Sequence, residues 1–208
     1  MMNWDKPKIG IGLVNKSDVS IDWTFMFHRL VAGLSGDVKV YLYKTYNIDV
    51  ARETIVENIL KDGLEKVLFI DTDIYLTPAD VVRLYRQKYP IVTGVYWVPR
   101  PKDAGGSISN LFIKDSKGVF RPVVDINPIK GNQAYVDGAG FGCIMIDSEV
   151  FRKIKKPWFV YRDPPGLSED LYFSDKATKA GFKILADGNV LCKHEKRVRF
   201  LFNGELDL

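Results

Sequence analysis

The sequence predicts an α/β fold in which a mostly parallel central sheet is flanked by helices and accompanied by a smaller irregular β region. Three observations support this prediction. Apolar strand patterns and helical patterns alternate through the first half of the chain in the order β-α-β-α-β-α-β. Residues 67–70 are continuously apolar, as expected of a strand that is covered on both faces. The second half holds shorter strand patterns separated by turns.

The elements of the first half follow from hydrophobic periodicity. The clearest helix covers residues 49–61, because its apolar residues recur on one face at a period of 3.6 and Gly63 follows its end. Another helix begins at Thr77 and Pro78, a favourable cap and first-turn pair, and ends before Pro90. A third helix is expected at residues 21–34, and strands at residues 8–14, 38–43, 67–70 and 91–98.

The second half is less regular. Residues 99–110 are polar and contain Gly105-Gly106, which predicts a loop. Short strands are expected within residues 111–146, helices at residues 148–154 and 168–180, and final strands at residues 183–186 and 190–193. No linker composition divides the chain, so we expect one domain over residues 1–208, with a first half at about 8–98, a second half at about 99–195 and a tail at 196–208.

Composition restricts the class of protein. The chain is 46% apolar and 27% charged, which is ordinary for a globular protein and excludes a disordered tail, a collagen-like fibre or a disulfide mini-protein. A formal net charge of +4 is too small to indicate a nucleic-acid partner. No apolar run approaches the ~18 residues of a membrane span. Cys143 and Cys192 are expected to be free thiols, and the lack of a signal-peptide pattern favours a cytoplasmic location.

Asp71-Thr72-Asp73 is the first candidate for chemistry. Such a tripeptide occurs by chance in a chain with this many aspartates, so its position gives it weight. It directly follows the strand at 67–70, and ligands of open α/β sheets bind outside the carboxyl ends of strands. Two carboxylates there offer hard oxygen ligands to Mg²⁺ or Mn²⁺, and the cation in turn suits a diphosphate. The alternative is a solvated turn in which Asp73 bonds its own backbone.

Two further charged residues lie in the first turns of predicted helices. Arg52 opens the helix at 49–61, where it suits a phosphate or the edge of a base; a surface arginine is the alternative. Ser168 is expected to cap the helix at 168–180 and to hold Asp170 in its first turn, where the carboxylate would act as a general base toward a hydroxyl. The alternative for Asp170 is an acid that stabilises the start of its helix.

His194 follows the last expected strand and is a candidate third ligand for a cation held by Asp73, although a lone histidine is usually structural. The glycine-rich segment 138–142 does not fit a dinucleotide-binding motif, because Cys143 stands where the third glycine is needed. Its glycines instead favour the close approach of a sugar or of another backbone. Three aromatic residues suit either a sugar face or the core, namely Trp97, Trp158 and Tyr161.

Three segments of this chain occur in an order and spacing typical of one family. They are the run 68–73 followed by a helix that begins with proline, the run 136–142, and the stretch from Ser168-Glu169-Asp170 through 180–184 to His194. This combination resembles the GT-A class of nucleotide-diphospho-sugar glycosyltransferases, over residues 8 to 194. The resemblance implies a GT-A fold in a single domain, with a nucleotide-binding half at about 8–98 and an acceptor and metal half at about 99–195.

The resemblance also implies a metal-dependent transfer of sugar from a UDP- or GDP-sugar to a hydroxyl on a glycan, protein or lipid. The nucleotide sugar would contact Val14, Asn15, Lys16, Arg52, Asp71, Thr72 and Asp73. Mn²⁺ or Mg²⁺ would be held by Asp71, Asp73 and His194 and would stabilise the departing diphosphate. Asp170 would be the catalytic base of an inverting enzyme, which is favoured over a retaining one. The acceptor or sugar would contact Gly140, Trp158 and Glu169.

Glu53 departs from the family pattern, since related chains often carry Asn after the Arg of the second helix. Other functions stay open: a sugar-nucleotide nucleotidyltransferase, although residues 14–17 form a poor phosphate loop; a metal-dependent phosphoesterase, which needs further carboxylates near Asp71; and a non-catalytic nucleotide- or carbohydrate-binding module. Peripheral membrane contact through the basic tail and the oligomeric state are also open. The loops at Gly105-Gly106 and 164–166 are expected to order over the donor.

Overall fold

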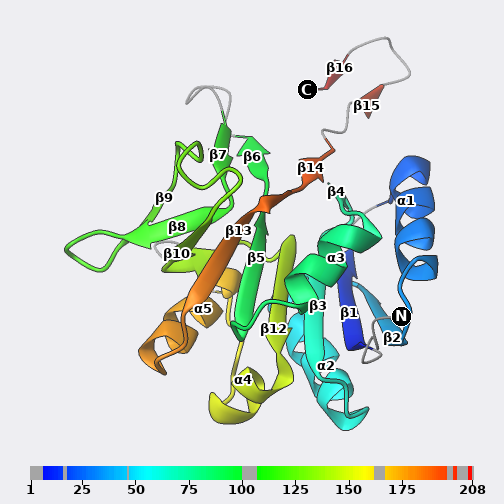
Figure 1. The fold of residues 1–208 in the computed structure, drawn as a ribbon, viewed down its shortest axis with the longest axis horizontal. Helices are drawn as coiled ribbons and strands as arrows, with labels where there is room; N and C mark the ends of the chain where they lie inside the picture. The colour runs from blue at the N-terminus through cyan, green and yellow to red at the C-terminus, as the bar shows by residue number, and fades with distance from the viewer. Residues whose placement is uncertain are drawn as a thin grey trace.

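The computed structural model describes residues 7–15, 18–45, 47–99, 107–161, 167–195, 199–200 and 206–207. Within these ranges a seven-stranded sheet is covered by helices on both faces (Figure 1). Helices α2 (Ile48–Lys61), α4 (Ser148–Lys153) and α5 (Glu169–Lys179) contribute to the core on one face. Helices α1 (Ile21–Ala32) and α3 (Pro78–Tyr85) contribute to the core on the other. The described chain therefore forms three layers, as the predicted α/β class requires.

The central sheet is mixed. Its strands lie in the order β10 (Gln133–Val136), β13 (Ile184–Leu191), β5 (Ile91–Val95), β12 (Cys143–Asp147), β3 (Lys66–Ile70), β1 (Lys8–Asn15) and β2 (Asp37–Lys44). Pairing is parallel between β1 and β2, β1 and β3, and β5 and β13. Pairing is antiparallel between β12 and each of its neighbours, and between β10 and β13. Three of the six pairings are parallel, so the prediction of a mostly parallel sheet is confirmed only in part. A hydrophobic run marks a buried strand but not its direction.

Smaller sheets complete the described part of the chain. β4 (Ile74–Tyr75) pairs with β14 (Lys193–His194), and β6 (Trp97–Pro99) pairs with β7 (Ser107–Ser109). β8 (Leu111–Lys114) lies between β11 (Gly138–Ala139) and β9 (Phe120–Pro122), and β15 (Arg199–Phe200) pairs with β16 (Leu206–Asp207). The irregular β region expected in the second half is present in β8, β9 and β11. The short strand β4 was not predicted, and its two residues are too few to show a pattern.

Local signals account for the helices that position the strand ends. Thr77 and Asp80 form a capping box at the start of α3, with Pro78 in the first turn as predicted. Helix α2 packs closely against β1, because a Cβ on Gly12 would lie 2.8 Å from Cγ2 of Ile55. A glycine is needed there for the helix and strand to approach.

Two strand boundaries differ from the prediction. The expected strand at 91–98 is divided at Tyr96 into β5 and β6, because the side-chain oxygen of Asn110 accepts a hydrogen bond from the Tyr96 backbone N–H at 3.0 Å. The two expected final strands are joined in β13, whose pairing register with β5 shifts between Ala186 and Leu191. This shift in register explains why the apolar pattern lapses between the two halves of one strand.

None of the helices within the described ranges combines the length and hydropathy needed to cross a membrane. Several expectations concern residues outside these ranges: Lys16, the loops at Gly105-Gly106 and 164–166, and residues 196–198, 201–205 and 208 of the tail. Cys143 and Cys192 are both free, as predicted, and both are buried.

A buried carboxylate joins three elements at the register shift of β13. Oδ2 of Asp187 accepts hydrogen bonds from Nε of Arg83 in α3 at 2.8 Å, from Gln87 at 2.7 Å and from Gln133 in β10 at 3.2 Å. Oδ1 accepts from the backbone and side-chain nitrogens of Asn189. Burial alone would raise the pKa of Asp187, but these hydrogen bonds outweigh it and hold the pKa below the usual carboxyl range.

We expect Asp187→Asn to lower the free energy of unfolding by about 2–3 kcal/mol at pH 7, because hydrogen bonds to a buried charge are lost. A carboxyl whose pKa is lower in the folded state stabilises the fold above its unfolded pKa, about 3.9, and this contribution is lost as the pH falls through the folded value. The difference in free energy of unfolding between wild type and Asp187→Asn should therefore become smaller below about pH 4. Urea denaturation at pH 7 and pH 3 measures it.

Asp125→Asn is the matched control, because Asp125 is exposed and accepts a hydrogen bond only from the nearby backbone N–H of Asn127 among the contacts described. It should change the free energy of unfolding by less than about 0.5 kcal/mol. Equal losses in the two variants, or a difference that does not depend on pH, would contradict the role given to Asp187.

Candidate active site

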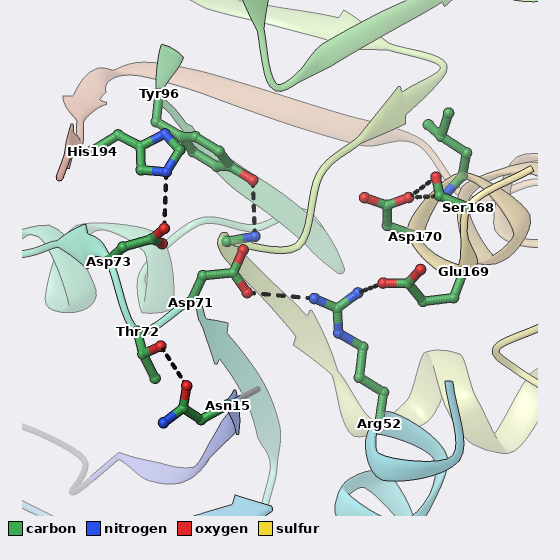
Figure 2. A network of polar contacts seen from close by, with 12 residues as sticks. Asn15, Arg52, Asp71, Thr72, Asp73, Tyr96, Ser168, Glu169, Asp170 and His194 are labelled. Atoms are coloured by element: carbon green, nitrogen blue, oxygen red, sulfur yellow. Dashed lines mark hydrogen bonds and ion pairs between the residues drawn. The ribbon is translucent and has the colours of Figure 1, made fainter. Parts of the chain in front are cut away.

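Asp71 and Asp73 lie in the turn that connects β3 to β4, at the carboxyl end of β3 (Figure 2). The backbone N–H of Ile74 donates to the carbonyl of Asp71 at 3.0 Å and closes this turn. The backbone N–H of Asp71 donates to the carbonyl of Gly142 at 3.1 Å. The turn is thereby fixed to the segment that leads into β12, and both carboxylates lie where the sequence places them.

The structure brings His194 to Asp73. Strand β14 pairs with β4 so that His194 lies opposite Ile74. Nε2 of the imidazole lies 3.1 Å from Oδ2 of Asp73, and Nδ1 lies 2.6 Å from the carbonyl oxygen of Trp97. A carbonyl oxygen only accepts, so Nδ1 carries a hydrogen and Nε2 presents either a second hydrogen or its lone pair to the carboxylate. The hydrogen bond with Asp73 raises the pKa of His194.

Glu195 holds the strand that carries this histidine. Its backbone N–H donates to the carbonyl of Asp73 at 2.8 Å. Its Oε2 accepts from the hydroxyl of Ser20 at 2.7 Å and from the hydroxyl of Tyr75 at 2.8 Å. Ser20 is also the N-cap of α1, where its hydroxyl oxygen accepts from the backbone N–H of Trp23. These contacts fasten β14 to β4 and to the start of α1.

Asp73 and His194 have the chemistry of ligands for a divalent cation. A hydrogen bond from Nδ1 to a backbone carbonyl is the arrangement that commonly orients a metal-binding imidazole and directs its Nε2 lone pair. A carboxylate oxygen and an imidazole nitrogen both suit Mn²⁺. Across the described ranges, however, no three His, Cys, Asp or Glu side chains are grouped so as to hold a metal ion. The expected set of three ligands is not assembled, because the Asp71 carboxylate faces Arg52.

Arg52 is buried beneath this edge of the sheet. Its Nη2 lies 3.5 Å from Oδ1 of Asp71, and its Nη1 donates a hydrogen bond to Oε1 of Glu169 (Figure 2). The guanidinium carbon lies 5.6 Å and 5.1 Å from the ring centroids of Phe69 and Phe141. The expected contact of Arg52 with a nucleotide does not fit this position, because the side chain is only 3% exposed and points inward.

Asp71 is partly enclosed by the surrounding groups. Burial raises the pKa of Asp71, the charge of Arg52 opposes that rise, and the charges of Asp73 and Asp170 add to it. Close packing on this side requires a glycine at position 142, because a Cβ there would lie 2.9 Å from Oδ2 of Asp71 and 2.7 Å from the hydroxyl of Tyr96. The prediction that these glycines permit a close approach thus applies within the protein itself.

Asp170 lies in the first turn of α5, as predicted. Its Oδ1 accepts hydrogen bonds from the hydroxyl of Ser168 and from the backbone N–H of Leu171, the latter at 2.7 Å. Ser168 occupies the N-cap position, but its hydroxyl binds Asp170 rather than capping the helix. The other oxygen, Oδ2, lies near Gly140, since a Cβ on that glycine would be 3.7 Å away. The carboxylate is therefore held by one oxygen and directed toward the glycine segment by the other.

Other predicted site residues have structural contacts. Asn15 accepts a hydrogen bond from the hydroxyl of Thr72 at 3.4 Å, which joins the ends of β1 and β3, and Val14 is half-buried beside it. Trp158 is 4% exposed, and its indole N–H donates to carbonyls of Phe151 and Ile154. The expected contact of Trp158 with a sugar does not fit a ring packed in the core. Glu169 is likewise buried against Arg52, which does not fit the expected contact with an acceptor.

Sequence reasoning missed Tyr96. Its ring is buried, its hydroxyl accepts from the backbone N–H of Gly142 at 3.0 Å, and its ring lies edge-on to His194 with centroids 5.8 Å apart. Burial raises the pKa of Tyr96, so the hydroxyl stays protonated. The signal that marks Asp71 applies here too, because Tyr96 directly follows the buried strand β5.

Comparison with known proteins gives a fold and no family. No protein-family model and no curated protein sequence matches the chain. Among solved structures, A197 from STIV has a TM-score of 0.63 at 19% identity, over 97% of this chain and 93% of that one. The two proteins share a fold at that level of similarity.

Weaker matches include two enzymes. The inositol-1-phosphate CTP transferase from T. maritima has a TM-score of 0.49 at 13% identity, over 91% of this chain and 89% of that one. A glycosyltransferase involved in the glycosylation of the major capsid of PBCV-1 has a TM-score of 0.39 at 10% identity, over 73% and 69%. Both scores lie below 0.5, so neither likeness bears on the activity of this chain.

Glu53 provides a test of the structural assignments. Its Oε2 accepts hydrogen bonds from the backbone N–H groups of Trp158 and Phe159 at 2.9 and 3.2 Å. We expect Glu53→Ala to lower the free energy of unfolding by about 1–3 kcal/mol, because two backbone donors lose their acceptor. Urea denaturation of wild type and variant measures this loss, and an unchanged free energy of unfolding would contradict the structural role given to Glu53.

Proposed function

We propose that this chain is a metal-dependent glycosyltransferase of the GT-A class, which moves a sugar from a UDP- or GDP-sugar to a hydroxyl acceptor. One observation carries the proposal. Asp73, His194 and Asp170, which are far apart in the sequence, lie around Asp71 at the edge of the sheet where β3 ends (Figure 2). Such an edge is where α/β sheets bind their ligands. We further propose that residues 1–208 act as one domain.

Asp73 and His194 would hold Mn²⁺ or Mg²⁺ in this proposal, with oxygens of the donor diphosphate as further ligands. The bound cation would neutralise negative charge on the diphosphate as it departs. The acidic character of the site supports a role for a cation, because without one the carboxylates of Asp71, Asp73 and Asp170 would repel a diphosphate. Asp71 then lies beside the donor, where an ionised carboxylate accepts hydrogen bonds from sugar or ribose hydroxyls.

Asp170 would accept the proton of the acceptor hydroxyl. Its Oδ1 is held by Ser168 and Leu171, so the proton would go to Oδ2, which lies near Gly140. The acceptor oxygen would attack the anomeric carbon of the donor, the bond from that carbon to the diphosphate would break, and the diphosphate would leave with the electron pair. A base on the acceptor side supports inversion of the anomeric centre. The acceptor hydroxyl would belong to a glycan, a protein or a lipid.

We expect Asp73→Ala to abolish metal-dependent binding of UDP and GDP. When the nucleotide concentration is 100 times its dissociation constant, binding in the presence of Mn²⁺ should raise the free energy of unfolding of the wild-type protein by about 2.7 kcal/mol. The variant should show no Mn²⁺-dependent shift, because the carboxylate ligand is gone. A thermal-shift series with Mn²⁺ and with EDTA measures the effect, and Asp125→Asn is the control. An unchanged Mn²⁺-dependent shift in Asp73→Ala would contradict the assignment of this ligand.

We expect Asp170→Ala to bind donor and nucleotide as wild type does but to lose transfer by about 10²–10⁴-fold, the usual contribution of a general base. Measurements of nucleotide affinity and of sugar transfer to a panel of hydroxyl acceptors separate the two effects. Transfer at the wild-type rate would rule out Asp170 as the base. Tight nucleotide binding by wild type that needs no metal and gives no turnover would instead favour a binding module.

A further inference from the structure

Arg52 is unusual among the charged residues of the site because it is buried. Its side chain is 3% exposed, and its guanidinium lies over the rings of Phe69 and Phe141. Its Nε is the one buried side-chain nitrogen or oxygen in the described part of the chain that has no hydrogen-bond partner. A buried guanidinium requires opposite charge nearby, since the protein interior does not solvate it as water does.

The charges that balance Arg52 come from two elements. Asp71, at the end of β3, lies 3.5 Å from Nη2 and is 40% exposed. Glu169, in the first turn of α5, accepts a hydrogen bond from Nη1 and is 7% exposed. Figure 2 shows the guanidinium between the two carboxylates, with Asp170 next to Glu169 on the same turn. One side chain therefore links the donor side of the proposed site to its acceptor side.

The remainder of α5 is attached independently of this link. Phe173 is fully buried in the aromatic part of the core, and the hydroxyl of Ser174 accepts a hydrogen bond from the backbone N–H of Ala139 at 3.4 Å. Asp175 forms an ion pair with Lys114 at 2.8 Å. These contacts anchor the helix from its second turn onward. The hydrogen bonds of the Asp170 carboxylate are made within its own turn, to Ser168 and Leu171.

We infer that Arg52 is a positioning residue, which through Glu169 fixes the first turn of α5 and thereby the place of Asp170 relative to Asp71. For the role of Asp170 the inference rests on the proposed function. The ion pair also explains why an acidic residue occupies position 169, where the side chain is only 7% exposed. The sequence predicts that Arg52 contacts the nucleotide and that Glu169 contacts the acceptor. In the structure these two residues contact each other instead.

Hydrogen exchange in the ligand-free protein tests the link itself. Glu169→Ala should increase the exchange rates of amides in the first turns of α5 at least tenfold, while amides of α2 and β3 keep their wild-type rates. Glu169→Gln should restore part of the protection, because its amide oxygen still accepts from Nη1. Glu149→Ala is the matched control, since Glu149 forms an exposed ion pair with Arg152 in α4. Wild-type exchange in Glu169→Ala would overturn the inference.

Kinetics test the consequence for the reaction. Glu169→Ala should lower kcat at least tenfold and leave the affinity for UDP or GDP with Mn²⁺ within twofold, because Asp73 and His194 are not disturbed. Glu169→Ala should lower kcat by a smaller factor in the Arg52→Lys variant than in the wild-type protein. The two substitutions are not additive, because each of them breaks the same ion pair. If Glu169→Ala lowered nucleotide affinity by as large a factor as kcat, the inference would be overturned, and a role of Arg52 in binding the donor would be favoured.

The two hypotheses fail in different ways. A wild-type protein that binds no nucleotide and transfers no sugar would overturn the proposed function, whereas the exchange rates of α5 would still support or overturn the link between Arg52 and Glu169. Normal transfer by wild type together with unchanged kcat in Glu169→Ala would overturn the positioning role and leave the proposed function standing.

Discussion

A guanidinium that is removed from water must keep carboxylates close, and this requirement organises the acidic edge of the sheet. Arg52 satisfies it with Asp71, which directly follows β3, and with Glu169 from α5, while Phe69 and Phe141 pack against its planar group. Three elements that are distant in the sequence are thereby held in one arrangement. Breaking either ion pair would remove one of the two carboxylates that balance this buried charge, so the geometry of this edge is maintained by electrostatics as well as by apolar packing.

The direction of β12 is the second determinant of the site. Because this strand runs antiparallel between β3 and β5, the segment that leads into it arrives at the carboxyl ends of both neighbours. Gly142 there accepts a hydrogen bond from the backbone of Asp71 and donates one to the hydroxyl of Tyr96. A parallel strand in the same place would begin at the opposite edge. The mixed topology therefore supplies the backbone groups that surround the carboxylates.

Sequence patterns predicted most elements but not how the charged residues face. Periodicity located α2 and the buried strand β3, and Thr77 with Pro78 located the start of α3. The same periodicity also placed two charged residues on buried helix faces, which was not inferred from the sequence. Arg52 shares the buried face of α2 with Ile55 and Ile59, and Glu169 precedes Phe173 by one turn on the buried face of α5. Strand direction and the partner of each charge depend on tertiary contacts, which periodicity along one chain does not encode.

The attachment of β14 has a consequence for biosynthesis. The imidazole that pairs with Asp73 is at position 194, and Glu195 fastens its strand to β4 and to α1. Strand β13, which pairs with both β10 and β5, ends at Leu191, so the strand that completes the sheet leaves the ribosome only just before this histidine. The acidic edge would be complete only after that last stretch emerges and docks, and a translation product that stops shortly before it would be folded but incomplete at its most polar corner.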